Sequence, residues 1–241
     1  MKRPRQASTE DDPRAIGAAV RERVVLRVAG LGYTPAEPDR FPDRIEKFAE
    51  NLALWGATTS LTACPGDPAE TAFHVIDSLM PAVIAAGPDP GPLAGAFGPD
   101  RKILDVGTGA GFPGLILAAA TAATFTLAES RRKRASFLSV AIAEMGLLNV
   151  RVETAHITPS LLEPEFDLVT ARAVGEPGSF YAIAAGALRP SGLAILYASR
   201  SQRPNLDAAG AAGLSGYTRR AYTVERDGAT VERVLAIWRK M

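Results

Sequence analysis

The amino-acid sequence predicts an α/β fold with a seven-stranded, mostly parallel sheet, an antiparallel C-terminal hairpin and a small N-terminal helical region. Three observations predict this architecture. Apolar residues in the N-terminal third recur at helical spacing. From residue 102 onwards, short β-type runs alternate with helical ones, which is typical of parallel βαβ units. The last two β-type runs are separated by a Glu-Arg-Asp-Gly turn, which favours an antiparallel pair.

Composition narrows the class of protein. The 241 residues are 47% hydrophobic and 22% charged, which excludes a multidomain array and wholesale disorder. Lys and Arg number 27 against 26 for Asp and Glu, so a polyanionic partner would need a local basic patch. The single cysteine, Cys64, excludes an intrachain disulfide and a multi-thiolate metal site. It suits a reducing compartment, and we therefore expect a cytoplasmic protein without a bound metal.

Changes in composition divide the chain into four segments. Residues 1–14 have no apolar core after their basic residues, which excludes a secretory signal and predicts a disordered tail. A helical cap is expected over residues 15–86. Gly and Pro make up more than half of the following stretch, so a linker is expected over residues 87–100. The α/β domain then occupies residues 101–241.

The cap is predicted to contain three helices. Two apolar stripes define the first two: Val20, Val24, Val25 and Val28, then Ile45, Phe48, Leu52 and Trp55. The third begins where Asp67 can cap, Pro68 fits the first helical position and Glu70 can close a capping box. Helical spacing then places His74, Asp77 and Ser78 on one face.

The β-type runs give the expected strands. They lie at residues 102–107, 124–129, 150–155, 166–173 and 192–198, with the hairpin strands at 217–224 and 229–238. Residues 201–216 are rich in Ala, Gly and Ser and predict a loop or a weak helix. The stretch Val106–Ala128 has no charged residue and is long enough to cross a bilayer, but its glycines and proline break a helix. We interpret it as strand, turn, helix and strand, and expect no membrane partner.

A glycine-rich turn follows the first strand. In ILDVGTGAGFPG, Gly107, Gly109 and Gly111 alternate directly before a helix. Such glycines let the backbone turn tightly and approach a ligand, while free amides at the helix start face it. The turn therefore predicts a nucleotide-like ligand.

Two acids flank this turn and indicate the kind of ligand. Asp105, at the end of the first strand, can attract an ammonium and would repel a pyrophosphate. Glu129, at the end of the second strand, can accept hydrogen bonds from both ribose hydroxyls. This combination suits S-adenosylmethionine. The glycines at 109, 111 and 114 also fit a dinucleotide fingerprint, so a nucleotide-binding oxidoreductase remains an alternative. A turn without function would not explain acids at two matching strand ends.

Several motifs resemble one family. DVGTGAGFPG, RRKRASFL after Glu129, ARA at 171–173 and HVIDSL resemble the glucose-inhibited division protein B family. Its members are bacterial small-subunit (16S) ribosomal RNA methyltransferases that modify guanine at nitrogen 7. The likeness extends from about Phe48 to Lys240 and implies a Rossmann-like class I methyltransferase fold.

The resemblance also implies site residues. Cofactor contacts are implied at Gly107, Phe112, Ile157, Thr158 and Arg172. For Ile157 and Thr158 the alternative is ordinary loop packing, since the family's usual local sequence is not retained there. For Arg172 the alternative is a salt bridge to a helix, although an arginine that ends an apolar strand at the ligand-binding edge has no apolar role.

The chemistry requires little of the protein. Neutral guanine offers a lone pair at nitrogen 7, so no base has to remove a proton, and alignment of nucleophile and methyl carbon is sufficient. We therefore expect no catalytic triad. An Asn-Pro-Pro-aromatic or Asp-Pro-Pro-aromatic turn, typical of amine methylation, is absent after the fourth strand, where Thr170–Ala173 stand. Carbon methylation needs a cysteine nucleophile, and Cys64 lies in the helical cap.

Two groups of residues are candidates for contacts with the substrate. Four consecutive cations just after Glu129 can pair with RNA phosphates or simply form a solvated helix start: Arg131, Arg132, Lys133 and Arg134. His74 and Asp77 match the family's His and Asp, and either orient the base or the cofactor's amino-acid end or form a structural pair.

The chain also departs from the family pattern. Gly56 and Ala57 replace a polar pair after Trp55, Ser60 replaces an asparagine, and Ala198 and Ser199 replace Lys-Gly after the fifth strand. Shorter side chains make fewer hydrogen bonds to RNA, so these positions bear on the target nucleotide. The expected function is S-adenosylmethionine-dependent methylation of guanine nitrogen 7 in small-subunit ribosomal RNA, by a monomer that binds this RNA or the small subunit. The alternative is a divergent relative that methylates another RNA or a small molecule.

Overall fold

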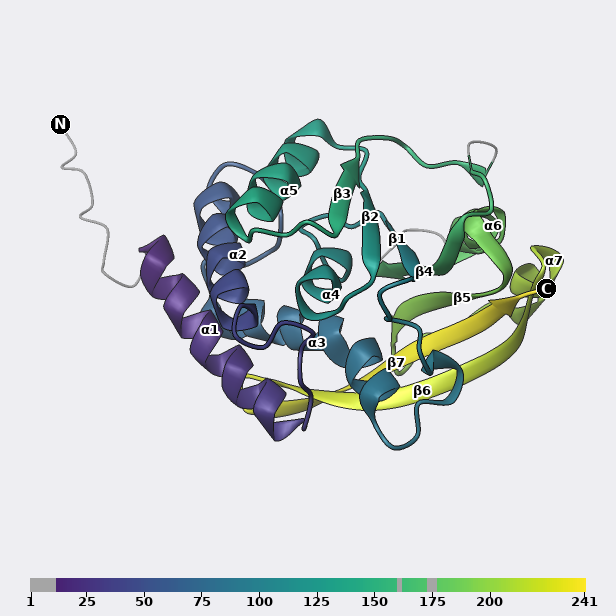
Figure 1. Cartoon of the computed structure of the whole chain (residues 1–241), viewed down its shortest axis with the longest axis horizontal. Coiled ribbons are helices and arrows are strands. Elements are labelled where there is room, and N and C mark those ends of the chain that lie inside the picture. The colour runs from purple at the N-terminus through teal and green to yellow at the C-terminus, as the bar shows by residue number, and fades with distance from the viewer. Residues whose placement is uncertain (1–11, 160–161, 173–176) are drawn as a thin grey trace.

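The computed structural model describes residues 12–159, 162–172 and 177–241. Nearly all of the tail expected at residues 1–14, and Ala173 of the expected fourth strand, lie outside the described residues. Helices and strands follow one another as in Figure 1. The helices are α1 (Pro13–Gly30), α2 (Phe41–Gly56), α3 (Pro68–Ala86), the short 3₁₀ helix η2 (Gly91–Leu93), α4 (Gly114–Ala120), α5 (Arg132–Glu144), α6 (Pro177–Ala187) and α7 (Leu206–Ala211). The strands are β1 (Lys102–Val106), β2 (Thr124–Ala128), β3 (Val150–Glu153), β4 (Phe166–Arg172), β5 (Leu188–Ser199), β6 (Leu214–Arg226) and β7 (Ala229–Lys240).

The seven strands form one sheet in the order β3-β2-β1-β4-β5-β7-β6. β1 to β5 pair in parallel, and β7 pairs antiparallel with both β5 and β6. The predicted fold class is therefore confirmed. Because β1, β2, β4 and β5 are parallel, their carboxyl ends lie along one edge of the sheet, where ligands bind in open α/β folds.

Both faces of the sheet are covered, as the alternation along β5 shows. Leu193, Ile195 and Tyr197 join a buried cluster with α1 to α5, whereas Ala194 and Leu196 join a second cluster with α6 and α7. The first cluster contains residues of the helical cap together with residues of β1, β2 and β5. The cap and this face of the sheet thus share one apolar core (Figure 1).

The cap helices follow their predicted apolar stripes with one correction. Val20, Val24 and Val28 are buried, but Val25 is 39% exposed. Successive helical residues point about 100° apart, so a residue next to Val24 turns away from the face that Val24 buries.

At the start of α3, the predicted cap by Asp67 is present but the predicted return bond of Glu70 is not. The Asp67 carboxylate accepts hydrogen bonds from the amides of Ala69 and Glu70, and Pro68 is the first helical residue. The expected return bond of a capping box is absent among the described residues. The Asp67 amide instead donates to the carbonyl of Cys64, and the Glu70 carboxylate pairs with Arg226 of β6. A charged guanidinium is a stronger hydrogen-bond donor to the Glu70 carboxylate than a neutral backbone amide is.

Of the helices that the structure describes, α3 is long and apolar enough to span a membrane by composition, but 61% of that window is buried inside the protein. Its buried hydrophobic residues belong to the core that the cap shares with the sheet. The expected linker also takes part in packing, because Leu93 is fully buried and Arg220 of β6 donates to Asp89 at 2.8 Å. Residues 87–100 are thereby held against the hairpin.

The turn of the hairpin between β6 and β7 consists of two residues. Arg226 pairs with Ala229, and Asp227 and Gly228 between them have φ of 50° and 75°. Two positive φ values match the right-handed twist of a two-residue hairpin, which explains the Asp-Gly sequence. Residues 201–216 contain the short helix α7, and their last three residues belong to β6, where a loop or weak helix was expected.

Candidate active site

The glycine-rich turn joins the end of β1 to α4. Gly107, Gly109 and Gly111 have φ of 67°, 60° and 92°, a region that side chains rarely adopt, so the turn depends on glycine. A Cβ on Gly109 would meet nothing closer than Arg134 Nη1 at 3.8 Å. The space beside Gly109 is therefore open, as a backbone that approaches a ligand requires.

Gly114 has a different role. A Cβ there would lie 2.6 Å from Asp105 Oδ2 and 2.5 Å from a methyl group of Leu127. The first turn of α4 thus touches β1 and β2 directly, and this contact sets the height of the glycine turn above the strand ends.

Asp105 lies beneath the turn. Its carboxylate is fully buried, and Oδ2 accepts a 2.8 Å hydrogen bond from the Gly114 amide. The other oxygen, Oδ1, has no hydrogen-bond partner among the described residues. Burial raises the pKa of this carboxyl to about 7, although Thr108, the Gly114 amide and the charge of Arg172 act in the opposite direction. Asp105 therefore fastens the turn and keeps one free acceptor there.

Glu129 links the ends of β2 and β1. Its carboxylate accepts from the amide of Gly109 at 3.1 Å and from that of Arg131 at 2.8 Å. The residue is 5% exposed. A carboxylate has about four acceptor positions, so both oxygens retain the capacity for a further donor. The two acids that the sequence analysis singled out thus hold the turn at two points.

Phe112 connects the turn to the cap and to β4. Its ring meets Phe48 and His74, each with centroids 5.3 Å apart, and lies 5.4 Å from the Arg172 guanidinium carbon. Cation and ring are close enough for an attractive contact. The structure therefore brings Phe112, His74 and Arg172 together beside the glycine turn.

His74 and Asp77 do not bond to each other. They are joined through Arg172, whose Nη2 donates to His74 Nδ1 at 2.5 Å and whose Nη1 lies 3.3 Å from Asp77 Oδ2. Burial, reinforced by the charge of Arg172, lowers the pKa of His74 to about 4, so its ring is neutral at physiological pH. The ion pair between Arg172 and helix α3 is present, and a role of Arg172 toward a cofactor stays a prediction.

The C-terminal hairpin supplies two further partners for Asp77 that sequence reasoning missed. Tyr222 donates to Oδ1 at 2.7 Å, and Arg233 donates through Nε at 3.2 Å and Nη2 at 3.0 Å. Asp77 is fully buried, and two arginines and a hydroxyl satisfy it. The sequence could have predicted that these two residues are neighbours. A two-residue turn at Asp227 and Gly228 fixes the register that places Tyr222 opposite Arg233.

The segment after β3 packs on the face of the sheet that α6 and α7 cover. Ile157 is half-buried and packs against the cluster formed with α6 and α7. Thr158 is half-buried in the same segment. Ile157 thus has a packing role, and cofactor contacts at both residues stay predictions.

The basic run at the start of α5 is divided. Arg131, Arg132 and Lys133 are exposed. Arg134 instead donates to the Ser60 carbonyl through Nη2 at 2.6 Å and Nε at 3.1 Å, which ties the connection between α2 and α3 to α5. Only the first three are therefore presented to solvent.

One departure from the family pattern has a local structural reason. A Cβ on Gly56 would lie 2.2 Å from the Pro65 side chain, so the close approach of the two backbones requires glycine at this position.

Comparisons with known proteins show the family of the chain. A family model described as rRNA small subunit methyltransferase G (GidB) matches residues 42–224. The ribosomal RNA small subunit methyltransferase G of Acidiphilium cryptum is 37% identical over 172 residues, which cover 68% of this chain and 71% of that protein. The enzyme of the same name from Wolinella succinogenes is 33% identical over 160 residues, 66% of this chain and 76% of that protein. A solved structure of a putative sarcosine dimethylglycine methyltransferase from Galdieria sulphuraria has a similar fold, with a TM-score of 0.53 at 12% identity over 72% of this chain and 88% of that one.

Proposed function

Because the chain belongs to the rRNA small subunit methyltransferase G family, we propose that it transfers a methyl group from S-adenosylmethionine to nitrogen 7 of a guanine in small-subunit (16S) ribosomal RNA. We place this activity in the cytoplasm, in a monomer that binds the RNA or the small subunit. The observation that carries the proposal is the open glycine turn between two buried acids at the carboxyl edge of the sheet.

The residues of the turn fit the proposed cofactor. Glu129 has acceptor capacity left for two ribose hydroxyls, and the peptide at Gly109 has open space beside it. When ionised, the Asp105 carboxylate, whose Oδ1 has no hydrogen-bond partner among the described residues, provides negative charge beneath the turn for the ammonium of the amino-acid end. A dinucleotide would bring a pyrophosphate next to this carboxylate, which disfavours the oxidoreductase alternative.

The chemistry then depends on position. When bound, S-adenosylmethionine supplies a methyl group on a positively charged sulfur. The guanine nitrogen 7 lone pair forms a bond to the methyl carbon while the carbon–sulfur bond breaks, which leaves S-adenosylhomocysteine and a cationic methylated base. Nitrogen 7 carries no proton, so no side chain has to act as a base. The protein aligns the two reactants at about 3–3.5 Å, and this proximity is the catalytic contribution.

Three residues are suited to orient the base. His74 is neutral, its Nδ1 is occupied by Arg172, and its Nε2 lies 3.9 Å from Glu70 Oε2, too far for a hydrogen bond. Its Nε2 hydrogen is thus available to an acceptor such as a guanine oxygen. The buried Phe112 ring and the Arg172 guanidinium pack against each other and against His74, and so hold its ring in position.

The test is mass spectrometry of 16S ribosomal RNA nucleosides from strains with and without the gene. The proposal predicts that one 7-methylguanosine disappears without the gene and returns with the wild-type copy. An unchanged 16S profile, together with a lost modification in another RNA, would establish the divergent relative instead. Calorimetry with S-adenosylhomocysteine and with a nicotinamide dinucleotide separates the oxidoreductase, because only the first should release heat.

A further inference from the structure

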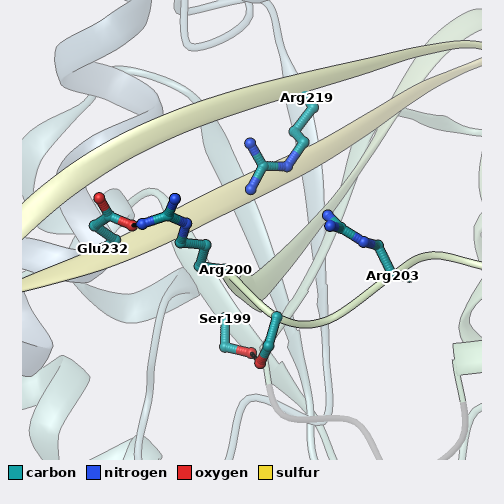
Figure 2. A pocket seen from close by; sticks show the side chains of 6 residues that line it. Ser199, Arg200, Arg203, Arg219 and Glu232 are labelled. Atoms are coloured by element: carbon teal, nitrogen blue, oxygen red, sulfur yellow. Dashed lines mark hydrogen bonds and ion pairs between the residues drawn. The ribbon is translucent and has the colours of Figure 1, made fainter.

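A second polar hollow lies beyond the end of β5 and is not part of the cofactor site. It has a volume of about 690 Å³ and is lined by Ser199, Arg200, Ser201, Arg203, Arg219 and Glu232. Figure 2 shows Arg203, in the loop after β5, and Arg219, on β6, directed toward the same space, with Arg200 turned toward Glu232 beside them. We call it the arginine hollow.

The charge of this hollow is not balanced. Arg200 pairs with Glu232. Arg203 and Arg219 are exposed, and neither side chain makes a hydrogen bond or ion pair to the described part of the chain. The whole chain has a net charge of only +1, so two uncompensated cations beside a third form a local positive region. Their mutual repulsion is relieved when an anion binds.

The residue types indicate a repeating anion rather than a small molecule. Pockets for small ligands are mostly apolar, with a few converging polar groups. In the arginine hollow every lining side chain is polar or charged. Guanidinium groups on long side chains match phosphate oxygens in bidentate fashion, and the hydroxyls of Ser199 and Ser201 add donors.

The arginine hollow adjoins another hollow whose lining includes two partners of Asp77. This neighbouring hollow, of about 330 Å³, shares Arg200, Arg219 and Glu232 and is also lined by Tyr222 and Arg233. Both Tyr222 and Arg233 bond to Asp77, which is joined to Arg172 and thereby to the glycine turn. In the sheet, β5 is two strands from β1 and β6, which carries Arg219, is four strands from β1, roughly 10 Å and 20 Å away. A polynucleotide that enters the site can therefore extend over the arginines.

We propose that the arginine hollow binds the phosphate backbone of the substrate RNA next to the target guanine, through Arg203 and Arg219 above all. This inference rests on the proposed function. It adds a second RNA contact surface to the site at the glycine turn. The phosphates would hold the strand in register, while the base is read at the glycine turn.

The experiment uses the whole protein and unmodified 16S ribosomal RNA transcribed in vitro. The double variant Arg203→Ala/Arg219→Ala should bind this RNA roughly tenfold more weakly at physiological salt. The slope of log affinity against log salt should fall by about 0.7 for each lost phosphate contact. KM for RNA should rise while kcat, the affinity for S-adenosylhomocysteine and Tm stay unchanged, because neither side chain has a partner within the described chain.

Two matched variants complete the test. Arg14→Ala/Arg23→Ala removes two exposed arginines from α1 and should leave RNA affinity and salt slope unchanged. Arg203→Lys/Arg219→Lys retains the charges and should restore the salt slope. If the hollow variant binds and methylates RNA like the α1 control, the inference is wrong and the proposed function stands. If the wild-type protein binds the RNA through these arginines but methylates neither this RNA nor small subunits assembled from it, the proposed function fails and the RNA surface remains.

Discussion

At the scale of single residues, the two acids beside the glycine turn combine structural and binding roles. Asp105 accepts from the Gly114 amide and Glu129 from that of Gly109, so each carboxylate holds one end of the turn. Both are nearly or fully buried. Burial favours the neutral form of an acid, which makes Asp105 sensitive to pH near neutrality.

The raised pKa of Asp105 predicts a pH-dependent stability. A carboxyl whose pKa is about 7 in the fold and near 4 in the unfolded chain favours folding below pH 4, and this contribution is lost as pH rises through 7. Asp105→Asn removes the titration. Its Tm relative to wild type should therefore increase between pH 5 and pH 8, by about 3 °C or more.

Thermal unfolding at the two pH values measures this effect. Asp207→Asn, on an exposed position of α7, serves as control and should show no such difference. A constant offset between Asp105→Asn and wild type at both pH values would contradict the assignment. The same variant should weaken S-adenosylhomocysteine binding most at pH 8, where the wild-type carboxylate is charged.

At the scale of elements, α4 is fixed to the sheet by a close contact of the Gly114 backbone with side chains of β1 and β2. A methyl group on Gly114 would press on Asp105 and Leu127. Gly114→Ala should therefore destabilise the protein by about 1–3 kcal/mol and lower S-adenosylhomocysteine affinity, because α4 must move away from β1.

Urea unfolding and calorimetry test this prediction. Gly210→Ala in α7 is the matched control, since a Cβ there meets nothing within 4 Å, and it should be neutral or stabilise by up to about 1 kcal/mol. Equal effects of the two substitutions would show that α4 does not depend on close packing.

The second pair of elements joined at the site is α3 and the hairpin, which meet through Asp77. Asp77→Ala leaves the mostly buried Arg172 and Arg233 without their counter-ion and should cost about 3–5 kcal/mol. Asp89→Ala breaks a solvent-exposed pair with Arg220 and should cost less than about 1 kcal/mol.

Chemical denaturation of both variants provides the comparison. A cost for Asp77→Ala no larger than that for Asp89→Ala would mean that the buried charges contribute little to joining α3 and the hairpin. Tyr222→Phe, which removes one of the three partners of Asp77, should lie between the two, at about 1 kcal/mol.

At the scale of the whole molecule, local sequence patterns were sufficient for the architecture. Short β-type runs between helical ones located the five parallel strands, and alternation together with the Asp-Gly turn located the hairpin. The glycine turn and its two acids lie close together in the sequence or at matching strand ends, so their meeting was predictable as well. Val25 was wrongly expected to be buried. A stripe of four apolar residues does not show which of two adjacent residues, Val24 or Val25, faces the core.

Contacts between distant segments were not predictable. Glu70 looked like the second half of a capping box, yet it pairs with Arg226 from the far end of the chain. Tyr222 and Arg233 likewise reach Asp77, and Arg219 reaches the arginine hollow, only because the C-terminal hairpin pairs with β5. Spacing along the sequence does not predict such long-range contacts. They can be predicted only after the register of the hairpin has been derived.

The way Asp77 is satisfied has a consequence for biosynthesis. Its donors Tyr222 and Arg233 follow it by 145 and 156 residues, so a growing polypeptide on the ribosome contains this carboxylate long before it contains them. Until translation is nearly finished, Asp77 therefore lacks two of its three partners, and the contact between α3 and the hairpin cannot form. A chain released early, even one that contains the entire glycine turn, would therefore lack a working methyl-transfer site.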